Sequence, residues 1–171
     1  EIGYVEIESI LRFVDGIRYH FYCAVDVKGK FAFALMYKHL NSQNTVDFFK
    51  KLEMVYPYSI ITVQTDNGLE FLGDFQDYLV KGDIPHVFIY PRCCRINGVV
   101  ERFNRTIQEN FIDNNLDIIH NPKLFTSKLI DYLIFYNTER VHSAHDNLKS
   151  PMDYLILEGV MSKMSATHTN A

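Results

Sequence analysis

The chain has 171 residues, of which 47% are hydrophobic, so it is long enough and apolar enough to form one globular domain with a sizeable core. Its formal net charge is −4, which argues against strong unaided binding of nucleic acid, because domains that bind nucleic acid unaided are usually basic. No apolar run approaches the roughly 18 residues of a membrane span, and three cysteines, two of them adjacent, make no disulfide framework. We expect a cytoplasmic protein with reduced cysteines and no membrane partner.

Three antiparallel strands are predicted at the start of the chain. They cover residues 4–10, 19–27 and 31–37. The first strand alternates apolar and polar residues, which places Glu6 and Glu8 on one face, and Asp15 and Gly16 form a hairpin turn signal before the second strand. A continuous antiparallel segment of sheet is therefore expected here.

Helices and strands alternate in the prediction for the rest of the chain. The expected helices cover residues 45–55, 71–80, 99–112, 123–136 and 152–157, and the expected strands cover 60–65 and 86–89. Ser42 or Asn44 is the expected cap of the first helix. Because the fourth and fifth strands follow crossovers, they are expected to be parallel to the strand before them. The order predicts an α/β fold, a five-stranded mixed sheet flanked by helices, in residues 1–158, with a disordered tail over 159–171.

Two acidic residues are the strongest candidates for chemistry. Asp66 directly follows a buried strand, at the sheet edge where ligands bind in open α/β sheets, and Glu101 opens an amphipathic helix. Carboxylates brought together from a strand end and a helix start can hold Mg²⁺ or Mn²⁺, which prefer oxygen ligands. Two such ions, roughly 4 Å apart, can activate a nucleophile and stabilise the leaving oxygen in phosphoryl transfer.

The helix that begins near Gly98 carries polar residues along one face. Glu101, Arg105 and Gln108 recur at the spacing of a single helix face, so the acid could bind metal while the other two contact phosphate or a base. The alternative is an ordinary solvated helix face with an ion pair four residues apart. His142 and His145 could also ligate a metal, but a structural or surface role is favoured because no third partner is near them in sequence.

Several segments together resemble a known family. They are Gln64–Phe71, Tyr90–Arg92, Asn97–Thr106 and Tyr136–His142, with Ser150 and Pro151 after them. This combination resembles the catalytic core shared by retroviral integrases and bacterial insertion-sequence transposases, the DDE family, over roughly residues 3–157. The resemblance implies a ribonuclease H-like fold.

The resemblance also implies a site of three acids, Asp, Asp and Glu, that holds two Mg²⁺ or Mn²⁺ ions. Asp66 matches the second acid and Glu101 the third, and Glu8 stands where the family has the first Asp. The stem of Glu8 is one methylene longer, and a misplacement of roughly 1 Å at a reacting centre can cost on the order of 100-fold in rate. Asn67 and Gly68 are expected to shape the turn behind the second acid. Asp26 is expected to support the site.

DNA is the partner that the resemblance implies, as element ends and as target. The residues expected to contact it are Arg92, Arg95, Asn104, Arg105 and Gln108. The resemblance further implies a homo-oligomer on DNA in the bacterial nucleoid. Because the chain begins with Glu1 rather than Met, we expect that a DNA-binding segment precedes it and reads the element ends, while this domain recognises no specific DNA sequence.

The predicted function is metal-dependent hydrolysis of DNA 3′ ends followed by strand transfer, impaired by Glu8. Other positions also depart from the family pattern: Cys93 and Cys94, Ile96, Val141 and His145. The alternative is therefore a catalytically inactive remnant that folds, assembles or binds DNA weakly without cutting it, so whether the chain is an enzyme stays open. A third possibility, a ribonuclease H-like nuclease without strand transfer, fits the helix after Gly98 less well.

Overall fold

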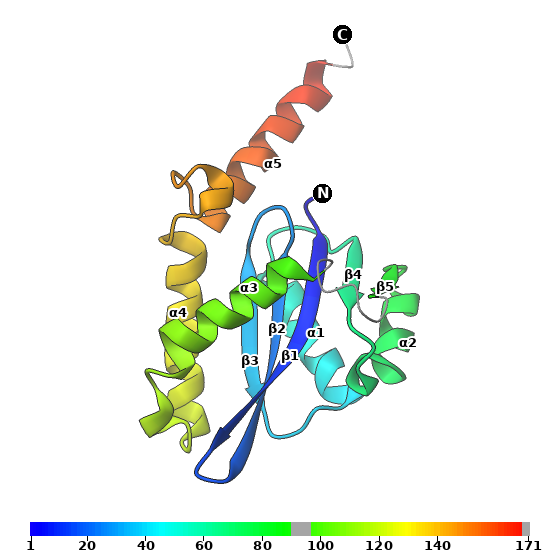
Figure 1. The fold of residues 1–171 in the computed structure, drawn as a ribbon. Coiled ribbons are helices and arrows are strands. Elements are labelled where there is room, and N and C mark those ends of the chain that lie inside the picture. The colour runs from blue at the N-terminus through cyan, green and yellow to red at the C-terminus, as the bar shows by residue number, and fades with distance from the viewer. Residues whose placement is uncertain (90–96, 169–171) are drawn as a thin grey trace.

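The computed structural model describes residues 1–89 and 97–168, with side chains described up to residue 159. Figure 1 shows a twisted sheet with helices on both faces. The strands are β1 (Tyr4–Val14), β2 (Ile17–Asp26), β3 (Ala32–Tyr37), β4 (Thr62–Thr65) and β5 (His86–Phe88). The helices are α1 (Ser42–Val55), α2 (Asp74–Lys81), α3 (Gly98–Ile107), α4 (Pro122–Thr138) and α5 (Pro151–His168). The α/β fold with a five-stranded mixed sheet is as predicted.

The sheet has the strand order β3-β2-β1-β4-β5. β1, β2 and β3 pair antiparallel, as predicted, and β4 and β5 pair parallel. The partner of β4 is β1 rather than β3, because α1 carries the chain back across the sheet to the free edge of β1. This pairing aligns Ile7 with Thr65, so that the end of β4 lies beside the middle of β1.

Local sequence explains where the helices begin. Asn41 caps α1, because its extended backbone lets its side-chain oxygen accept a hydrogen bond from the Asn44 amide at 2.8 Å. The predicted cap, Ser42 or Asn44, is therefore wrong, because the observed cap lies just before Ser42. Asn121 caps α4 in the same way through the amide of Leu124, 3.3 Å away. α3 continues into one π-helical turn, Gln108–Ile112. This turn interrupts the regular α-helical hydrogen bonding of a helix that lines the candidate site.

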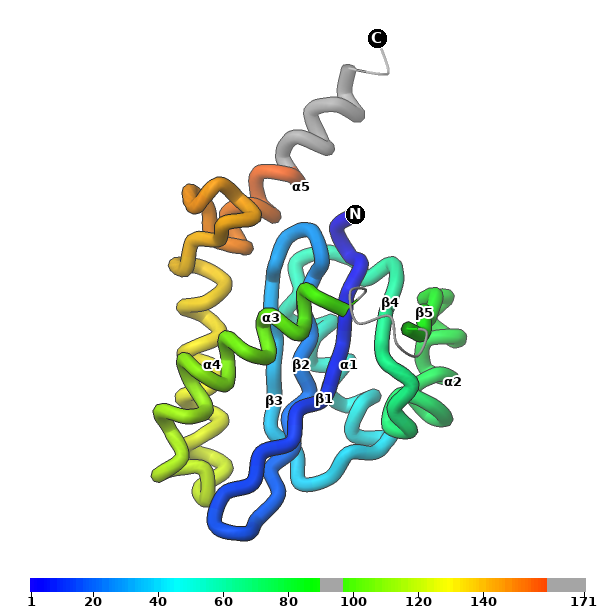
Figure 2. Tube along the Cα trace, viewed as in Figure 1, coloured from blue at the N-terminus to red at the C-terminus, as the bar shows by residue number. Residues whose placement is uncertain are grey.

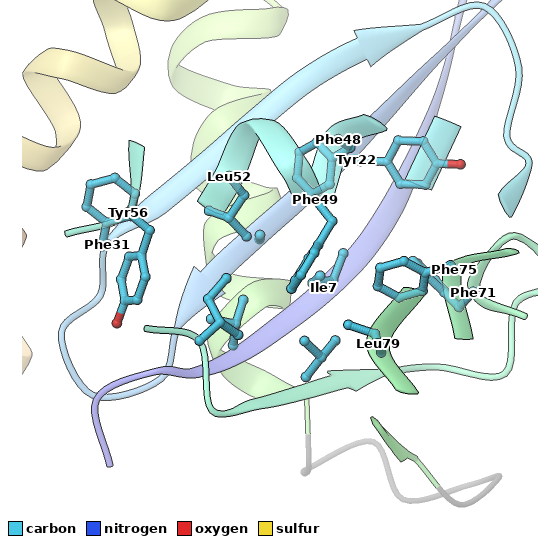
Figure 3. Packing of buried hydrophobic residues seen from close by; sticks show 14 of the residues in the cluster. Ile7, Tyr22, Phe31, Phe48, Phe49, Leu52, Tyr56, Phe71, Phe75 and Leu79 are labelled. Carbon is cyan, nitrogen blue, oxygen red and sulfur yellow. The ribbon is translucent and has the colours of Figure 1, made fainter. Parts of the chain in front are cut away.

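One face of the sheet is sealed by an aromatic core. α1 and α2 cover this face, and Figure 3 shows their rings interleaved with side chains from β1 and β2. The labelled members are Ile7, Tyr22, Phe31, Phe48, Phe49, Leu52, Tyr56, Phe71, Phe75 and Leu79. Phe49 meets Phe75 edge to face with ring centroids 5.5 Å apart, and both are fully buried. Ile7 of β1 and Val63 of β4 both belong to this core, so it packs against the two strands that carry the candidate site.

The opposite face is covered by α3 and α4 and carries polar groups among its apolar ones. Figure 2 shows α3 crossing β1 and β2 obliquely before the chain reaches α4. Val100, Phe103 and Ile107 of α3 are buried against the sheet, as their spacing predicts. Asn137 of α4 fastens that helix to β3, because its amide both donates to and accepts from the backbone of Ala32, at 2.8 and 2.9 Å.

Two helices differ in length from the prediction. α5 runs Pro151–His168 instead of 152–157 and so extends through much of the segment that was predicted as a tail. α2 begins at Asp74 rather than residue 71, because Leu69–Phe71 forms a separate 3₁₀ turn and Gly73 takes a positive φ of 56° between them. In the described part of the chain, no helix is both long and apolar enough to cross a membrane.

Candidate active site

Strand pairing brings Glu8 and Asp66 together. β1 and β4 run parallel with Ile7 beside Thr65, so the next residue on each strand is an acid. β4 ends at Thr65, whereas β1 continues to Val14, and Asp66 therefore lies just past the carboxyl end of its strand, as predicted. Both carboxylates are partly exposed at this step in the sheet.

Helix α3 adds an acid and an amide to the two strands. Glu101 lies in its first turn and is exposed, and Asn104 lies one turn further along the helix and is buried. The Asn104 Nδ2 atom donates a hydrogen bond to Glu8 Oε2 at 2.6 Å. The helix is thereby joined to β1 at the acid that stands in the first position of the predicted triad.

The turn behind Asp66 is built by the two residues expected to shape it. The Gly68 amide donates to Asp66 Oδ1 at 2.9 Å, which fixes the carboxylate over the turn. A Cβ on Gly68 would lie 3.0 Å from that oxygen and 2.6 Å from Glu70 Oε2, so glycine leaves room for both carboxylates. The Asn67 side chain donates to the Ile89 carbonyl at 2.8 Å and ties the turn to the end of β5.

Burial and the neighbouring acids together change the protonation of Glu8. Its pKa is raised from the ordinary 4.5 to about 7, first by burial and then by the charges of Glu101 and Asp66, against the lowering effect of the Asn104 hydrogen bond. Without a cation, a proton on Glu8 relieves this repulsion near neutral pH. A cation held among the three carboxylates would relieve it as well.

Glu6 anchors the start of α3, a role that sequence reasoning did not assign to it. It is only 4% exposed, and its Oε2 atom accepts hydrogen bonds from the amides of Val99 and Val100 at 3.1 and 2.9 Å. These are orphan donors of the first helical turn, and the side chain of Asn97, the residue before the helix, caps neither. The signal in the sequence is a second acid two residues before Glu8, on the same strand face.

Glu70 is a further acid near the site that sequence reasoning left without a role. Its Oε1 atom accepts a hydrogen bond from the hydroxyl of Ser9 at 2.8 Å, and its backbone carbonyl accepts from Thr45 at 2.8 Å. Ser9 directly follows Glu8, so Glu70 ties the turn after β4 to β1 just beyond the acid pair. Its position in a 3₁₀ turn four residues after Asp66 is the sequence feature that could have indicated this contact.

A groove of about 580 Å³ runs beside these acids between β1 and α3. We call it the carboxylate groove; it is lined by Glu8, Ser9, Ile10, Arg12, Glu101, Asn104, Arg105, Gln108, Glu109 and Asp113. The predicted face of α3 is therefore confirmed as one surface. Gln108 Nε2 donates to the Asn104 carbonyl at 3.0 Å, and Arg12 forms an ion pair with Asp113 at the far end of the groove. Arg92 and Arg95, which were also expected to contact DNA, lie outside the described residues.

Asp26 lies away from the three acids. It is 1% exposed and sits at the end of β2, paired across the sheet with Val5. Its carboxylate accepts hydrogen bonds from the Gly3 amide at 2.7 Å, from the Tyr56 hydroxyl at 2.8 Å and from the Gly29 amide. These contacts organise the β2–β3 turn and the beginning of β1.

The two histidines near the end of α4 have structural contacts. His145 is buried, its Nε2 atom lies 3.1 Å from the Gly29 carbonyl, and its ring stacks on Tyr154 with centroids 4.0 Å apart. His142 packs edge to face on Tyr136, and burial, with the nearby charges of Arg140, His145 and Lys30, lowers its pKa to about 4. These contacts favour the structural role over metal ligation.

The donor chemistry of the carboxylate groove fits a hard divalent cation. Its lining offers carboxylate oxygens from Glu8 and Glu101, and Asp66 lies next to Glu8 on the neighbouring strand. The Asn104 Oδ1 atom is buried in the same lining without a hydrogen-bond partner. Over the described residues, no three Asp, Glu, His or Cys side chains are already gathered closely enough to enclose a metal ion. The carboxylate groove therefore has suitable metal ligands close by, but these side chains stand too far apart to enclose an ion.

Comparison with known proteins points to one group. Residues 82–149 match the integrase core domain family. The chain is 28% identical over 155 residues to the putative integrase ORF3 of Spiroplasma virus SpV1-C74, covering 81% of this chain and 42% of that protein. The chain thus spans less than half the length of this relative.

Solved structures share the fold at low sequence identity. The catalytic core domain of HTLV-2 integrase, in complex with magnesium in a dimeric form, matches with a TM-score of 0.68 and 20% identity over 88% of this chain and 93% of that one. A chain of the simian T-cell lymphotropic virus intasome, in complex with the PP2A regulatory subunit B56 gamma, matches with a TM-score of 0.69 and 20% identity over 81% of this chain and 49% of that one. The ribonuclease H-like fold implied by the sequence motifs is confirmed. The chain therefore shares the fold of retroviral integrase catalytic cores, and its residues 82–149 match the integrase core domain family.

Proposed function

We propose that this domain catalyses metal-dependent hydrolysis of DNA 3′ ends and strand transfer during DNA integration. The observation that carries the proposal is the meeting of Glu8 and Asp66 on neighbouring parallel strands, with Glu101 and Asn104 on the helix that crosses them. The end of β4, the middle of β1 and the start of α3 converge there beside one open groove that a nucleic acid strand could enter.

In this proposal Glu8, Asp66 and Glu101 hold two Mg²⁺ or Mn²⁺ ions. When bound, the ions supply Lewis-acid stabilisation of the charge that develops on the phosphoryl oxygens. Asn104 keeps the Glu8 carboxylate oriented through its 2.6 Å hydrogen bond. Arg105 and Gln108 line the same groove and would position the DNA strand.

Both steps of the reaction are phosphoryl transfers. In the first, a water oxygen bonds to the phosphorus next to the element end, the bond from phosphorus to O3′ breaks, and the departing O3′ takes up a proton. In the second, that 3′-hydroxyl loses its proton as its oxygen bonds to a target phosphorus, and a target O3′ departs and is protonated. Holding two DNA ends in line is the main task of the protein in such reactions.

The proposed partners follow from the proteins that share the fold. HTLV-2 integrase core is known in dimeric and trimeric forms, and we propose that this domain likewise acts as a homo-oligomer on DNA, associated with the nucleoid. We also propose that the catalytic core comprises residues 1–158 and that a DNA-binding segment of the whole protein, beyond this chain, recognises the element ends. The Spiroplasma virus relative is more than twice as long as its aligned part, which supports further segments in the whole protein.

A catalytically inactive remnant remains the second candidate. Two observations favour it: Glu8 stands where the family has Asp, and across the described residues no three acids are already gathered around a metal position. A remnant would keep the fold, the oligomer and weak DNA binding without cutting.

Transfer of a labelled duplex end into supercoiled plasmid tests the proposal. With Mn²⁺ present, we expect joined product from the wild-type chain and at least a hundredfold loss, on the order expected when a reacting centre is misplaced, in Asp66→Asn and Glu101→Gln. The matched control Asp77→Asn removes an exposed acid on α2 and should keep full activity. No product from folded wild-type protein would instead support the remnant, and equal product from all four would show that the acids are assigned wrongly.

A further inference from the structure

A second hollow lies on the other side of helix α3. It has a volume of about 550 Å³ and is enclosed by the start of α3, the β2–β3 turn and the connection from α4 to α5, which Figure 1 shows at one end of the sheet. We call it the basic hollow, because three of its lining residues are the cations Lys30, Arg102 and Arg140. None of the roles described above uses it.

The three cations reach the basic hollow from three separate elements. Lys30 lies in the β2–β3 turn with a positive φ of 61°, and its ammonium donates to the Val27 carbonyl of the same turn, which holds the end of the side chain at the rim of the hollow. Arg102 is exposed on α3, and the Arg140 guanidinium stands 5.4 Å over the ring of Tyr136 just beyond α4. A ring surface under a guanidinium leaves its N–H groups free to bind an anion.

The positive charge of the basic hollow is only partly balanced, and the balancing charges of Glu6 and Asp26 act on Lys30. Among the residues that the structure describes, Lys30, Arg102 and Arg140 form no ion pair with a carboxylate. The single acid in the lining is Glu6, and its Oε2 atom is already held by two amides of α3. His142 adds no negative charge, and its lowered pKa partly reflects the nearby Arg140 and Lys30. In a chain with a net charge of −4, such a local excess of cations favours an anionic ligand.

The basic hollow and the carboxylate groove are adjacent faces of one helix. Gly98, Arg102 and Thr106 line the first, whereas Glu101, Arg105 and Gln108 line the second. Neighbouring residues of a helix point about 100° apart, so only the width of α3 separates the two hollows. A polymer with repeated phosphates can occupy both at once, while a small anion occupies one.

We propose that the basic hollow binds a phosphodiester of the DNA strand that crosses α3 from the carboxylate groove. This inference rests on the proposed function for the identity of the ligand as DNA. Lys30, Arg102 and Arg140 contact the backbone and no base, so they contribute affinity and position without sequence preference. Free phosphate offers the same chemistry but would leave DNA binding independent of these residues.

Salt-dependent binding of a labelled random-sequence duplex to the whole chain, measured by fluorescence anisotropy, tests the inference. For Arg102→Gln with Arg140→Gln, the slope of log affinity against log salt should fall in magnitude by about 1.8, since each phosphate contact contributes roughly 0.9. The control, Arg18→Gln with Lys38→Gln, removes the same charge from exposed positions at the opposite end of β2 and β3 and should change the slope much less. Urea unfolding of both variants checks that they fold.

The outcomes separate this inference from the proposed function. An equal change in slope for both double variants, an unchanged slope, or no DNA binding by wild-type protein at low salt would each overturn the inference. Inorganic phosphate that binds wild type and not Arg102→Gln with Arg140→Gln, with DNA binding unaltered, would make the hollow a small-anion site and also overturn it. Wild-type protein that gives no strand transfer but shows the expected difference in slope between the two double variants would overturn the catalytic proposal and support this inference.

Discussion

The two hollows beside α3 differ in charge although they share a helix. The carboxylate groove gathers acids from β1 and α3, beside Asp66 in the turn after β4, and the basic hollow gathers cations from the β2–β3 turn, α3 and the end of α4. Glu101 and Arg102 are neighbours in sequence, yet one faces each side, because a helix turns by about 100° per residue. A single helix can in this way present a metal-binding surface and a phosphate-binding surface to the same DNA strand.

Shortening the side chain of Glu8 is the substitution expected to raise the activity of the carboxylate groove most. The Glu8 carboxylate reaches across to Asn104 on α3, and Glu8→Asp would draw it back toward β1 and Asp66 by one methylene. If the longer stem misplaces a metal ion by roughly 1 Å, the substitution should raise strand transfer, by up to about a hundredfold. The plasmid-joining assay measures it, and salt-dependent DNA binding should not change. Slower joining by Glu8→Asp than by robust wild type would show that the site has adapted to glutamate.

Substituting Glu6 tests how much its hydrogen bonds to the start of α3, the helix between the two hollows, stabilise the protein. Glu6→Ala leaves the amides of Val99 and Val100 without their acceptor, which should cost about 1–3 kcal/mol of unfolding free energy, as for other buried donors left unpaired. Glu6→Gln keeps an acceptor oxygen and should cost clearly less. Urea unfolding gives both values. Equal losses in the two variants would mean that the charge of Glu6, not its hydrogen bonds, stabilises α3.

A smaller effect is expected from pH. Because the pKa of Glu8 is raised from 4.5 to about 7 in the folded protein, its contribution to stability is fully present below pH 4.5 and is lost as pH rises through about 7. Wild-type protein without metal should therefore lose stability relative to Glu8→Gln between these values, modestly, because Glu8 is partly exposed to solvent. Unfolding curves of both proteins across this range measure the difference. A difference that is flat with pH would contradict the raised pKa.

Much of the fold could be predicted from local patterns. Alternation in β1 and the turn signal at Asp15 and Gly16 gave the first hairpin, and the spacing of Val100, Phe103 and Ile107 gave the buried side of α3. The pairing of β4 with β1 could not be predicted, since nothing in a strand's own sequence states which edge it joins. The length of α5 was also missed.

The candidate site likewise has one part that local sequence indicates and one part that it does not. Asp66, Gly68 and Glu101 belong to short sequence motifs, and the structure brings these motifs together beside the carboxylate groove. The motifs alone could therefore indicate where the groove lies. The basic hollow could not, because Lys30 and Arg140 are far apart in sequence and each looks like an ordinary surface cation. Only tertiary packing brings them into one hollow with Arg102.

Titration of Mn²⁺ into the metal-free chain by calorimetry tests the central claim most directly, because it needs neither DNA nor turnover. Wild-type protein should bind Mn²⁺, and Asp66→Ala with Glu101→Ala should abolish that binding. The control, Asp77→Ala with Asp131→Ala, removes two exposed acids from α2 and α4 and should bind like wild type. Unchanged Mn²⁺ affinity in the Asp66→Ala and Glu101→Ala protein would contradict the assignment of the carboxylate groove as a metal site.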